Sequence, residues 1–286
     1  MNSLDHPEEV YSPFVLGDRE FIRLSTFIMS QFGIKLPLNK KILLQCRLQR
    51  RIKALHFQTF REYVDYVLSS SGQKEEVAHM IDAVSTNKTD FFREPAHFDF
   101  LMKEGLDHYI RTTGNEKISI WSAGCSSGEE PYSIAMTLKE YENRCKYIDF
   151  NILATDISES VLQHAIAGVY AEDKIQPVPG DYKQKYLLKG KNASAQKVRV
   201  ESYIRSKIEF RKFNLLTPDY LHLGMFDIIF CRNVLIYFER EVQHKILQQF
   251  CKNLKTKGLL FLGHSESITG YSLPLKHVRP TIYTRI

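Results

Sequence analysis

The segment from Ser119 to Met136 joins an apolar run, a turn of small residues and a helix, in an order typical of nucleotide-binding sites. Gly124 and Gly128 lie in the turn, and the helix opens on Glu129 and Glu130. The two glycines allow the backbone to approach a bound molecule closely. A pyrophosphate would need the bare positive end of the helix, where two carboxylates would repel it. The segment therefore predicts a site for a cation-bearing ligand rather than a phosphate.

S-adenosylmethionine has the charges that such a turn favours, since it carries a sulfonium and an ammonium and no phosphate. It fits this turn better than NAD or ATP does. A second predicted strand, Phe150–Asp156, ends on an acid that is placed to accept both ribose hydroxyls. Taken alone, the glycines and Asp156 could equally be ordinary turn residues and a strand terminator. In series they favour an S-adenosylmethionine site.

Composition and length place the chain among ordinary globular proteins. With 286 residues, 43% of them hydrophobic, it can bury one large core and a smaller one. We expect a cytoplasmic protein, because no stretch approaches the roughly 18 apolar residues of a membrane span and the first residues lack a signal-peptide pattern. The five cysteines include no Cys-x-x-Cys pair, so neither a disulfide framework nor a zinc site is predicted. Cys125 and Cys231 are expected to be buried fillers.

The charge is unevenly distributed along the chain. Between Phe21 and Arg61 there are nine basic residues and no acid, although the net charge is only +6. Arg47, Arg50 and Arg51 are spaced so that a helix would place them on one basic face. Such a face can be simply solvated, or it can contact an acidic protein surface or nucleic acid. The length of the run without acids favours a contact.

The pattern of apolar residues changes near residue 86. Helical spacing over 21–32, 44–55, 60–68 and 75–84 predicts a helical N-terminal part, in which Gly33 caps the first helix. A connector at 86–95 and a helix at 96–112 follow. Strands are then predicted at 118–123, 150–155, 208–213, 226–231 and 259–263, and helices at 130–141, 159–167 and 240–254, the last one ended by Gly258.

This alternation predicts an α/β domain with a parallel sheet. The carboxyl ends of its strands, where ligands bind in such sheets, carry Gly124, Asp156, Asn214 and Asn233. Between Val169 and Ser206 the alternation lapses, which indicates a small antiparallel insertion.

Five ordered motifs resemble those of the chemotaxis-receptor glutamate methyltransferases, the CheR type. They are the connector motif Thr86–Glu94, the turn Trp121–Ser133, the strand end Ala154–Asp156, the segment Phe230–Phe238 and the segment Gly263–Ser267. The helical N-terminal part and the closing residues Arg279–Tyr283 also resemble family members, so that the similarity covers nearly the whole chain.

The resemblance implies a Rossmann-like class I S-adenosylmethionine-dependent methyltransferase domain over 98–286, preceded by a helical domain over 1–85 and a connector over 86–97, with the β insertion at about 172–206. It further implies transfer of a methyl group to glutamate carboxylates on the cytoplasmic helical bundle of chemoreceptors, with S-adenosylhomocysteine as product. No metal and no nucleic acid are expected. Contact with a membrane is expected only indirectly, through receptors.

The resemblance also implies roles for individual residues. Asn87, Thr89 and Arg93 would close over the cofactor. Gly124 would contact the cofactor from the turn, Glu129 would hold its methionyl end, and Asp156 would hold its ribose. The adenine side would contact Asn214, Leu215, Asn233 and Val234, and the methyl group would lie nearest Arg93 and Tyr237. Arg47, Arg50 and Arg51 would face the receptor. From the residues alone, Asn87 and Thr89 could be turn and cap residues, and Tyr237 a core aromatic.

Residue chemistry agrees with this activity. A glutamate carboxylate is already ionised near neutral pH, so that methyl transfer needs positioning and exclusion of water rather than a strong base. Arg93 can orient a carboxylate through two donors. His264 is expected to be structural.

Three points leave alternatives open. Family members that dock on a receptor tail use a glycine-rich turn in the insertion, whereas Lys189–Gln196 holds one glycine, which puts tail docking in doubt. The basic strip would also suit a nucleic-acid methyltransferase of the same fold, although the Asn/Asp-Pro-Pro-aromatic turn of base-methylating enzymes is missing. A non-catalytic module that binds S-adenosylmethionine or a receptor is the third possibility.

Overall fold

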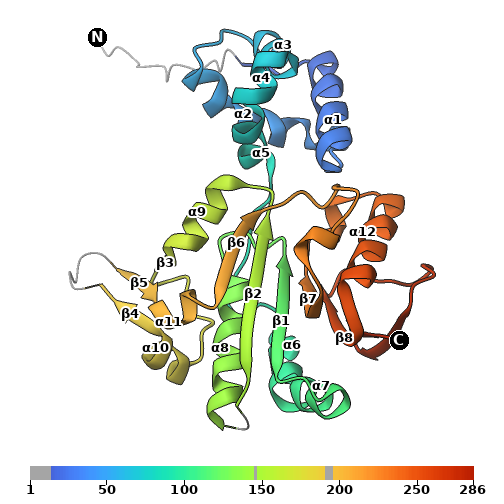
Figure 1. Cartoon of the computed structure of the whole chain (residues 1–286). Helices are drawn as coiled ribbons and strands as arrows, with labels where there is room; N and C mark the ends of the chain where they lie inside the picture. The colour runs from blue at the N-terminus through green and yellow to red at the C-terminus, as the bar shows by residue number, and fades with distance from the viewer. Residues whose placement is uncertain (1–13, 145–146, 191–195) are drawn as a thin grey trace, which may run out of the picture. The chain divides into compact units, whose positions relative to one another are not determined.

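The computed structural model describes residues 14–144, 147–190 and 196–286. The chain divides after Val84 into a helical unit and a sheet unit that begins at Ser85. Each unit is described by itself below (Figure 1). Among the described residues, no helix is both long enough and apolar enough to span a membrane.

In the described part of the helical unit, from residue 14 on, five short helices pack around apolar stripes. They are α1 (Asp18–Phe32), α2 (Lys41–Ala54), α3 (Phe60–Leu68), α4 (Ser70–Glu75) and α5 (Val77–Val84), with a 3-10 turn η1 (Leu38–Lys40) before α2. The predicted stripes are buried, as Leu44, Leu48 and Ile52 on α2 illustrate. Gly33 caps α1 as predicted, with φ of 70° and its N–H donating to the Met29 carbonyl. The helical prediction is therefore confirmed.

The sheet unit opens with a continuous helical stretch. It runs through α6 (Ala96–Phe100), a π-helical turn η2 (Leu101–Gly105) and α7 (Leu106–Thr113). The predicted strands follow as β1 (Lys117–Ala123), β2 (Asp149–Asp156), β6 (Ile208–Lys212), β7 (Phe226–Cys231) and β8 (Leu254–Leu262). The helices of the alternation are α8 (Glu129–Arg144), α9 (Glu159–Ala167) and α12 (Arg240–Asn253), and short turns η4 (Leu221–Leu223) and η5 (Leu235–Tyr237) flank β7.

These strands form a seven-stranded sheet in the order β6-β2-β1-β7-β8-β10-β9. The first five are parallel, whereas β10 (Ile282–Arg285) runs antiparallel to both β8 and β9 (Leu275–Arg279). Both faces of the sheet are buried, since Ile228 and Phe230 of β7 belong to one core cluster and Ile229 and Cys231 to another. This explains why the central strands read as unbroken apolar runs.

One predicted boundary is wrong. Gly258 does not end the helix before it, because α12 stops at Asn253 and β8 starts at the next residue. Gly258 instead lies within β8, where a Cβ would approach the backbone oxygens of Lys255 and Asp227 to 2.7 and 2.8 Å. The glycine is thus explained by close strand packing.

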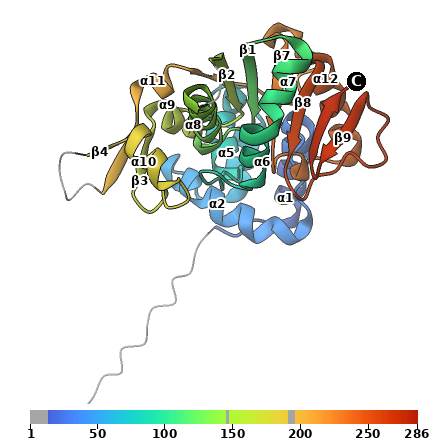
Figure 2. The ribbon, with the colours of Figure 1, turned by 90° about the horizontal axis from the view of Figure 1, so that it is seen from below.

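The predicted insertion is a separate three-stranded antiparallel sheet in the order β3-β5-β4. It begins at β3 (Val169–Ala171), ahead of the expected residue 172, because β3 pairs with β5 (Lys197–Val200). The other elements are α10 (Gly180–Tyr186), β4 (Leu187–Lys189) and α11 (Ser202–Arg205). Figure 2 shows β3, β4 and α10 together at one side of the sheet unit. Most of the Lys189–Gln196 turn lies outside the described residues.

Candidate functional site

The turn after β1 makes a close approach that requires glycine. Gly124 has φ of 81° and Gly128 has φ of 97°. A Cβ at Gly124 would lie 2.4 Å from Val234 Cγ2, and one at Gly128 would lie 2.8 Å from Ala165 Cβ. These close approaches are to the protein's own side chains, and the approach of the turn to a bound molecule stays a prediction.

Asp156 holds this turn in place. Its Oδ2 accepts a hydrogen bond from Ser126 N at 2.8 Å, and its Oδ1 accepts one from Ser158 N at 3.0 Å. Ser126 has φ of 49°, a conformation that a non-glycine residue adopts at some cost. A contact of this carboxylate with the ribose of a cofactor stays a prediction. The sequence pattern missed the structural part of this residue's role.

The connector packs on the same turn. Ser126 Oγ donates to the carbonyl of Asn87 at 2.9 Å, and Phe92 N donates to Ser133 Oγ on α8 at 2.9 Å. Phe91 is fully buried with its ring 4.9 Å from that of Tyr170 on β3, in an edge-on arrangement. These contacts join the predicted connector residue Asn87 to the turn that Asp156 holds.

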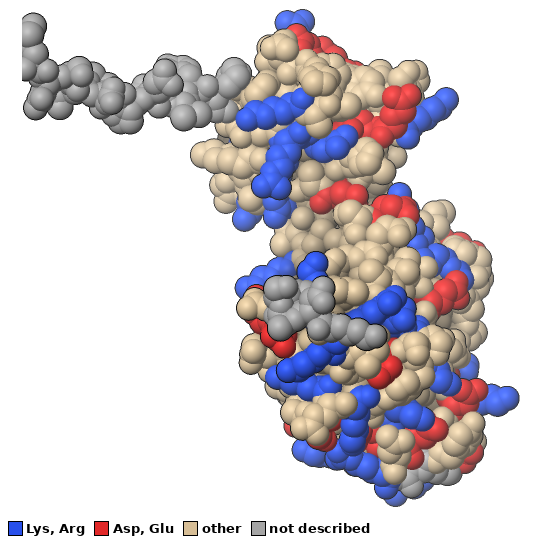
Figure 3. Space-filling model, turned by 90° about the vertical axis from the view of Figure 1, so that its left-hand side faces the viewer, with Lys and Arg blue, Asp and Glu red and all other residues tan. Residues whose placement is uncertain are grey.

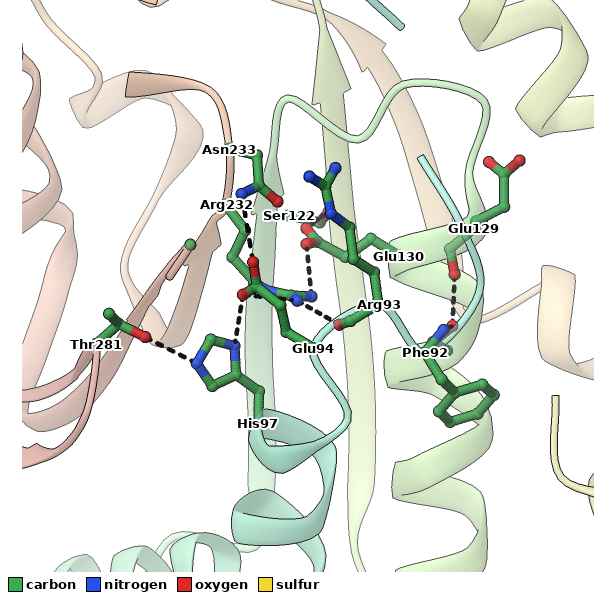
Figure 4. Close-up of polar contacts among 12 residues, drawn as sticks. Phe92, Arg93, Glu94, His97, Ser122, Glu129, Glu130, Arg232, Asn233 and Thr281 are labelled. Carbon is green, nitrogen blue, oxygen red and sulfur yellow. Dashed lines mark hydrogen bonds and ion pairs between the residues drawn. The ribbon is translucent and has the colours of Figure 1, made fainter. Parts of the chain in front are cut away.

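The backbone on both sides of Arg93 has an unusual conformation. Its neighbours Phe92 and Glu94 have φ angles of 50° and 56°, both in the left-handed region. As a result the three side chains diverge, and that of Arg93 extends away from the ring of Phe92 (Figure 4). Arg93 Nη1 donates to the Lys88 carbonyl at 3.2 Å. Strain of this kind is typical of functional segments.

The residue after β7, Arg232, is the centre of a buried polar network. Its Nη2 lies 3.0 Å from Glu94 Oε2 and also donates to the carbonyl of Arg93, while its Nη1 lies 3.3 Å from Glu130 Oε2. Glu130 also accepts from Ser122 Oγ at 2.7 Å. Only 2% of the Arg232 side chain is exposed. The network connects the connector, β1, α8 and the loop after β7 (Figure 4).

The carboxylates at the start of α8 therefore differ in role. Glu130 belongs to the network, whereas Glu129 accepts from Ser127 Oγ at 2.7 Å and is 3% exposed. Burial raises the pKa of Glu129, and the same cause raises the pKa of Glu130 against the opposing charge of Arg232. Burial alone would also raise the pKa of Glu94, but Arg232 and hydrogen bonds from His264 and Asn233 outweigh it and hold that pKa below its usual value.

Glu266 fixes the loop that contains Asn233 and Val234. Its carboxylate accepts four backbone hydrogen bonds, of 2.7 to 2.9 Å, from Asn233, Val234, Leu235 and Gly263. Asn233 has φ of 59°, and its Nδ2 donates to Glu94 Oε1 at 3.3 Å. Glu266 thus holds Val234 over Gly124.

Glu94, His97 and His264 are the described residues whose ligand atoms come closest to forming a metal site. One atom of each lies within 4.8 Å of the others. His97 is buried, which lowers its pKa to about 4, and its Nε2 contacts Thr281 Oγ1 at 2.9 Å. However, the Glu94 oxygen concerned, Oε2, already pairs with Arg232. A metal ion would face that cation, so the carboxylate suits arginine better.

The other predicted residues lie on loops of the sheet unit. Thr89 is half-buried in the connector, and Tyr237 is half-buried at the end of η5. Asn214 follows β6, where its Oδ1 accepts from Leu216 N at 2.9 Å, and the carbonyl of Leu215 accepts from the Tyr220 hydroxyl. Their contacts with a cofactor remain predictions. Cys125 and Cys231 are buried, and burial raises the pKa of both thiols, which agrees with a packing role.

The expected basic face on α2 is only partly available to a partner. Arg51 makes two hydrogen bonds to Glu76, at 2.9 and 2.6 Å, and Arg47 donates to the Val84 carbonyl. Glu76 is 1% exposed, so that Arg51 neutralises a buried carboxylate. Arg50 is exposed. Arg47 and Arg51 are therefore engaged in contacts within the helical unit, and contact of this basic face with a receptor stays a prediction.

Sequence reasoning assigned no function to Glu94, Arg232 or Glu266, and it treated Glu130 together with Glu129 as a carboxylate that favours a cation-bearing ligand. Glu94, Arg232 and Glu266 lie inside the motifs already noted, next to residues that did receive a role. A charged residue directly after a buried strand, as Arg232 is after β7, was the available signal. It identifies a buried ion pair but not its partner.

The parallel sheet, the glycine turn after β1 and the acid that ends β2 agree with the predicted class of protein, the S-adenosylmethionine-dependent methyltransferases. Residues 87–284 match the family described as CheR methyltransferase, SAM binding domain, and residues 19–85 match CheR methyltransferase, all-alpha domain. The chain belongs to the CheR methyltransferase family, and its cofactor is S-adenosylmethionine.

Curated relatives agree with this assignment. The chain is 41% identical over 271 residues to the chemotaxis protein methyltransferase of Borreliella burgdorferi, covering 93% of this chain and 94% of that protein. It is 37% identical over 254 residues to the chemotaxis protein methyltransferase of Escherichia coli, covering 89% of this chain and 86% of that protein. The similarity thus spans both units.

Proposed function

We propose that the protein methylates glutamate side chains in the cytoplasmic domains of chemoreceptors, forming glutamyl methyl esters during chemotactic adaptation. The observation that carries this proposal is the match of both units to the two domains of one methyltransferase family. A cytoplasmic location, with membrane contact only through receptors, follows from the same proposal. The alternatives of a nucleic-acid methyltransferase and a non-catalytic module have no comparable support.

The proposed chemistry depends on orientation more than on proton transfer. When bound, S-adenosylmethionine supplies a methyl group made electrophilic by its sulfonium. The substrate carboxylate is already ionised and needs no general base. Arg93 would orient that carboxylate by two hydrogen bonds, and Tyr237 would line the path of the methyl group.

Binding of the cofactor would use the carboxyl ends of the strands. We assign the methionyl ammonium to Glu129, whose carboxylate is buried beside the turn and is not part of the Arg232 network. The ribose is assigned to Asp156, and the adenine side to Asn214, Leu215, Asn233 and Val234. Asn87, Thr89 and Arg93 would cover the bound molecule from the connector.

A transfer assay tests the function directly. We expect tritiated S-adenosylmethionine to label a purified receptor cytoplasmic domain, and the label to leave as methanol in mild base because it is a carboxylate ester. RNA offered in parallel should remain unlabelled. Base-stable label on RNA would favour the nucleic-acid alternative, and binding without transfer to either would favour the non-catalytic one.

Arg50 is the residue of the predicted basic face that is best placed to meet a receptor. Basic side chains are visible on the face of the helical unit shown in Figure 3. Arg50→Glu should raise the receptor KM several-fold at low salt and weaken its salt dependence, because such contacts are screened beyond about 8 Å at physiological ionic strength. Cofactor affinity should not change.

The matched control is Arg19→Glu, which makes the same charge change at an exposed position on α1. Arg51 is unsuitable for this test, since its reversal would leave Glu76 buried without its cationic partner. Equal KM values for the wild type and the Arg50 variant at low ionic strength would show that this residue is only solvated.

A further inference from the structure

The Arg232 side chain contacts groups from three other segments of the sheet unit and is almost fully enclosed. Its acceptors are the Glu94 carboxylate, the Arg93 carbonyl and the Glu130 carboxylate, and its guanidinium carbon lies 5.5 Å from the centre of the Phe98 ring. With 2% of its side chain exposed, Arg232 is not placed to bind a substrate through its guanidinium. Any effect on catalysis must therefore pass through its neighbours.

The arrangement depends on the shape of arginine. Nε and Nη2 both lie near Glu94 Oε2, at 3.4 and 3.0 Å, while Nη1 points to Glu130 on α8. A lysine carries the same charge but cannot direct donors along these separate lines at once. The Glu94–Arg232 pair therefore joins the connector to the end of β7 with a defined geometry.

Two residues of the proposed site are fixed by this pair. Arg93 is bonded through its carbonyl to Arg232 and lies directly before Glu94, and both neighbours of Arg93 have positive φ angles. Asn233 follows Arg232, has φ of 59°, and donates from Nδ2 to Glu94 Oε1. The backbone is strained at Phe92, Glu94 and Asn233, and the hydrogen bonds of the pair oppose its relaxation.

We propose that Arg232, held by Glu94, is a positioning residue for methyl transfer, because it sets the backbone from which Arg93 reaches the substrate carboxylate. This inference rests on the proposed role of Arg93. It assigns to the Glu94–Arg232 pair a contribution to kcat that is separate from its contribution to folding.

The test is a double-mutant cycle between Arg232→Lys and Arg93→Ala. Arg232→Lys in the wild-type background should lower kcat about tenfold at saturating receptor and cofactor. In the Arg93→Ala background the same change should lower kcat less than threefold, because the side chain that it misplaces is already gone. Thermal unfolding of every variant shows whether each one is folded.

A charge pair elsewhere in the sheet unit provides the control. Lys255→Met removes the cationic partner of buried Asp227, whose oxygens lie 2.9 and 3.0 Å from Lys255 Nζ. It should lower the unfolding temperature and leave kcat of the folded protein within twofold. If Arg232→Lys does not fold, Glu94→Gln, which keeps the side-chain shape, replaces it in the cycle.

The outcomes separate the two proposals. Unchanged kcat in the Arg232 variant, or equal fold-losses in both backgrounds, would overturn the positioning role even if Arg93 matters. Unchanged kcat in Arg93→Ala would instead remove the proposed role of Arg93, and the inference with it.

Discussion

Arg93→Ala is expected to lower kcat about 100-fold at saturating receptor while weakening the binding of S-adenosylhomocysteine much less. A hydrogen bond to a charged group contributes about 1.5–3 kcal/mol, and a factor of 100 in rate corresponds to about 2.7 kcal/mol. The product carries no methyl group and needs no substrate carboxylate, so its affinity reports only the contact between Arg93 and the cofactor. Steady-state kinetics and calorimetry measure the two effects separately.

The appropriate control is Arg93→Lys, which keeps the charge but not the two-donor geometry. If bidentate orientation is the main contribution, the lysine variant should recover only a small part of the lost rate. Full recovery would indicate that charge alone is sufficient. A kcat within about twofold of the wild type in Arg93→Ala would show that the residue is structural, and that its only described side-chain bond, to Lys88, is what it provides.

Local patterns predicted the framework of the site well. Apolar runs ending in Gly124, Asp156 and Asn233 marked strand ends, and a parallel sheet brings such ends to one edge whatever the intervening sequence is. The helical unit was predictable for a similar reason, because buried stripes such as Leu44, Leu48 and Ile52 repeat at helical spacing.

The polar network was not predictable in this way. Glu94 and Arg232 are 138 positions apart in the chain, and no local period connects them. The difference in role between Glu129 and Glu130 is also invisible in the sequence, since two adjacent carboxylates at a helix start differ only in what the fold brings near them.

Short strands and packing contacts account for the other differences. The antiparallel strands β9 and β10 are brief and partly exposed, so that they lack a clear apolar run, and the sequence prediction omitted them. Arg51 appeared to be a surface charge because its buried partner, Glu76, is 25 residues away on another part of the helical unit. In both cases the structure depends on a contact with a distant part of the chain: strand pairing for β9 and β10, and the ion pair with Glu76 for Arg51.

Asp156→Ala should weaken the binding of S-adenosylhomocysteine by about 100-fold or more, because the residue has two functions that reinforce each other. It is the proposed acceptor for the ribose hydroxyls, and it accepts the backbone hydrogen bond from Ser126, which has a positive φ. Loss of a charged acceptor that leaves buried donors unpaired costs about 1.5–3 kcal/mol for each bond. Calorimetry on the folded variant gives the affinity directly.

An analogue of S-adenosylhomocysteine that lacks the ribose 2′-hydroxyl separates these functions. If Asp156 binds the ribose, the analogue should bind the wild type more weakly than the complete ligand does, and the substitution should weaken the analogue by a smaller factor than the complete ligand. If Asp156 acts only by holding the turn through Ser126 and Ser158, the substitution should weaken both ligands by the same factor. Asp156→Asn keeps one acceptor oxygen and should give an intermediate loss. Unchanged affinity of the alanine variant for the complete ligand would exclude both functions, because either one alone predicts a measurable loss.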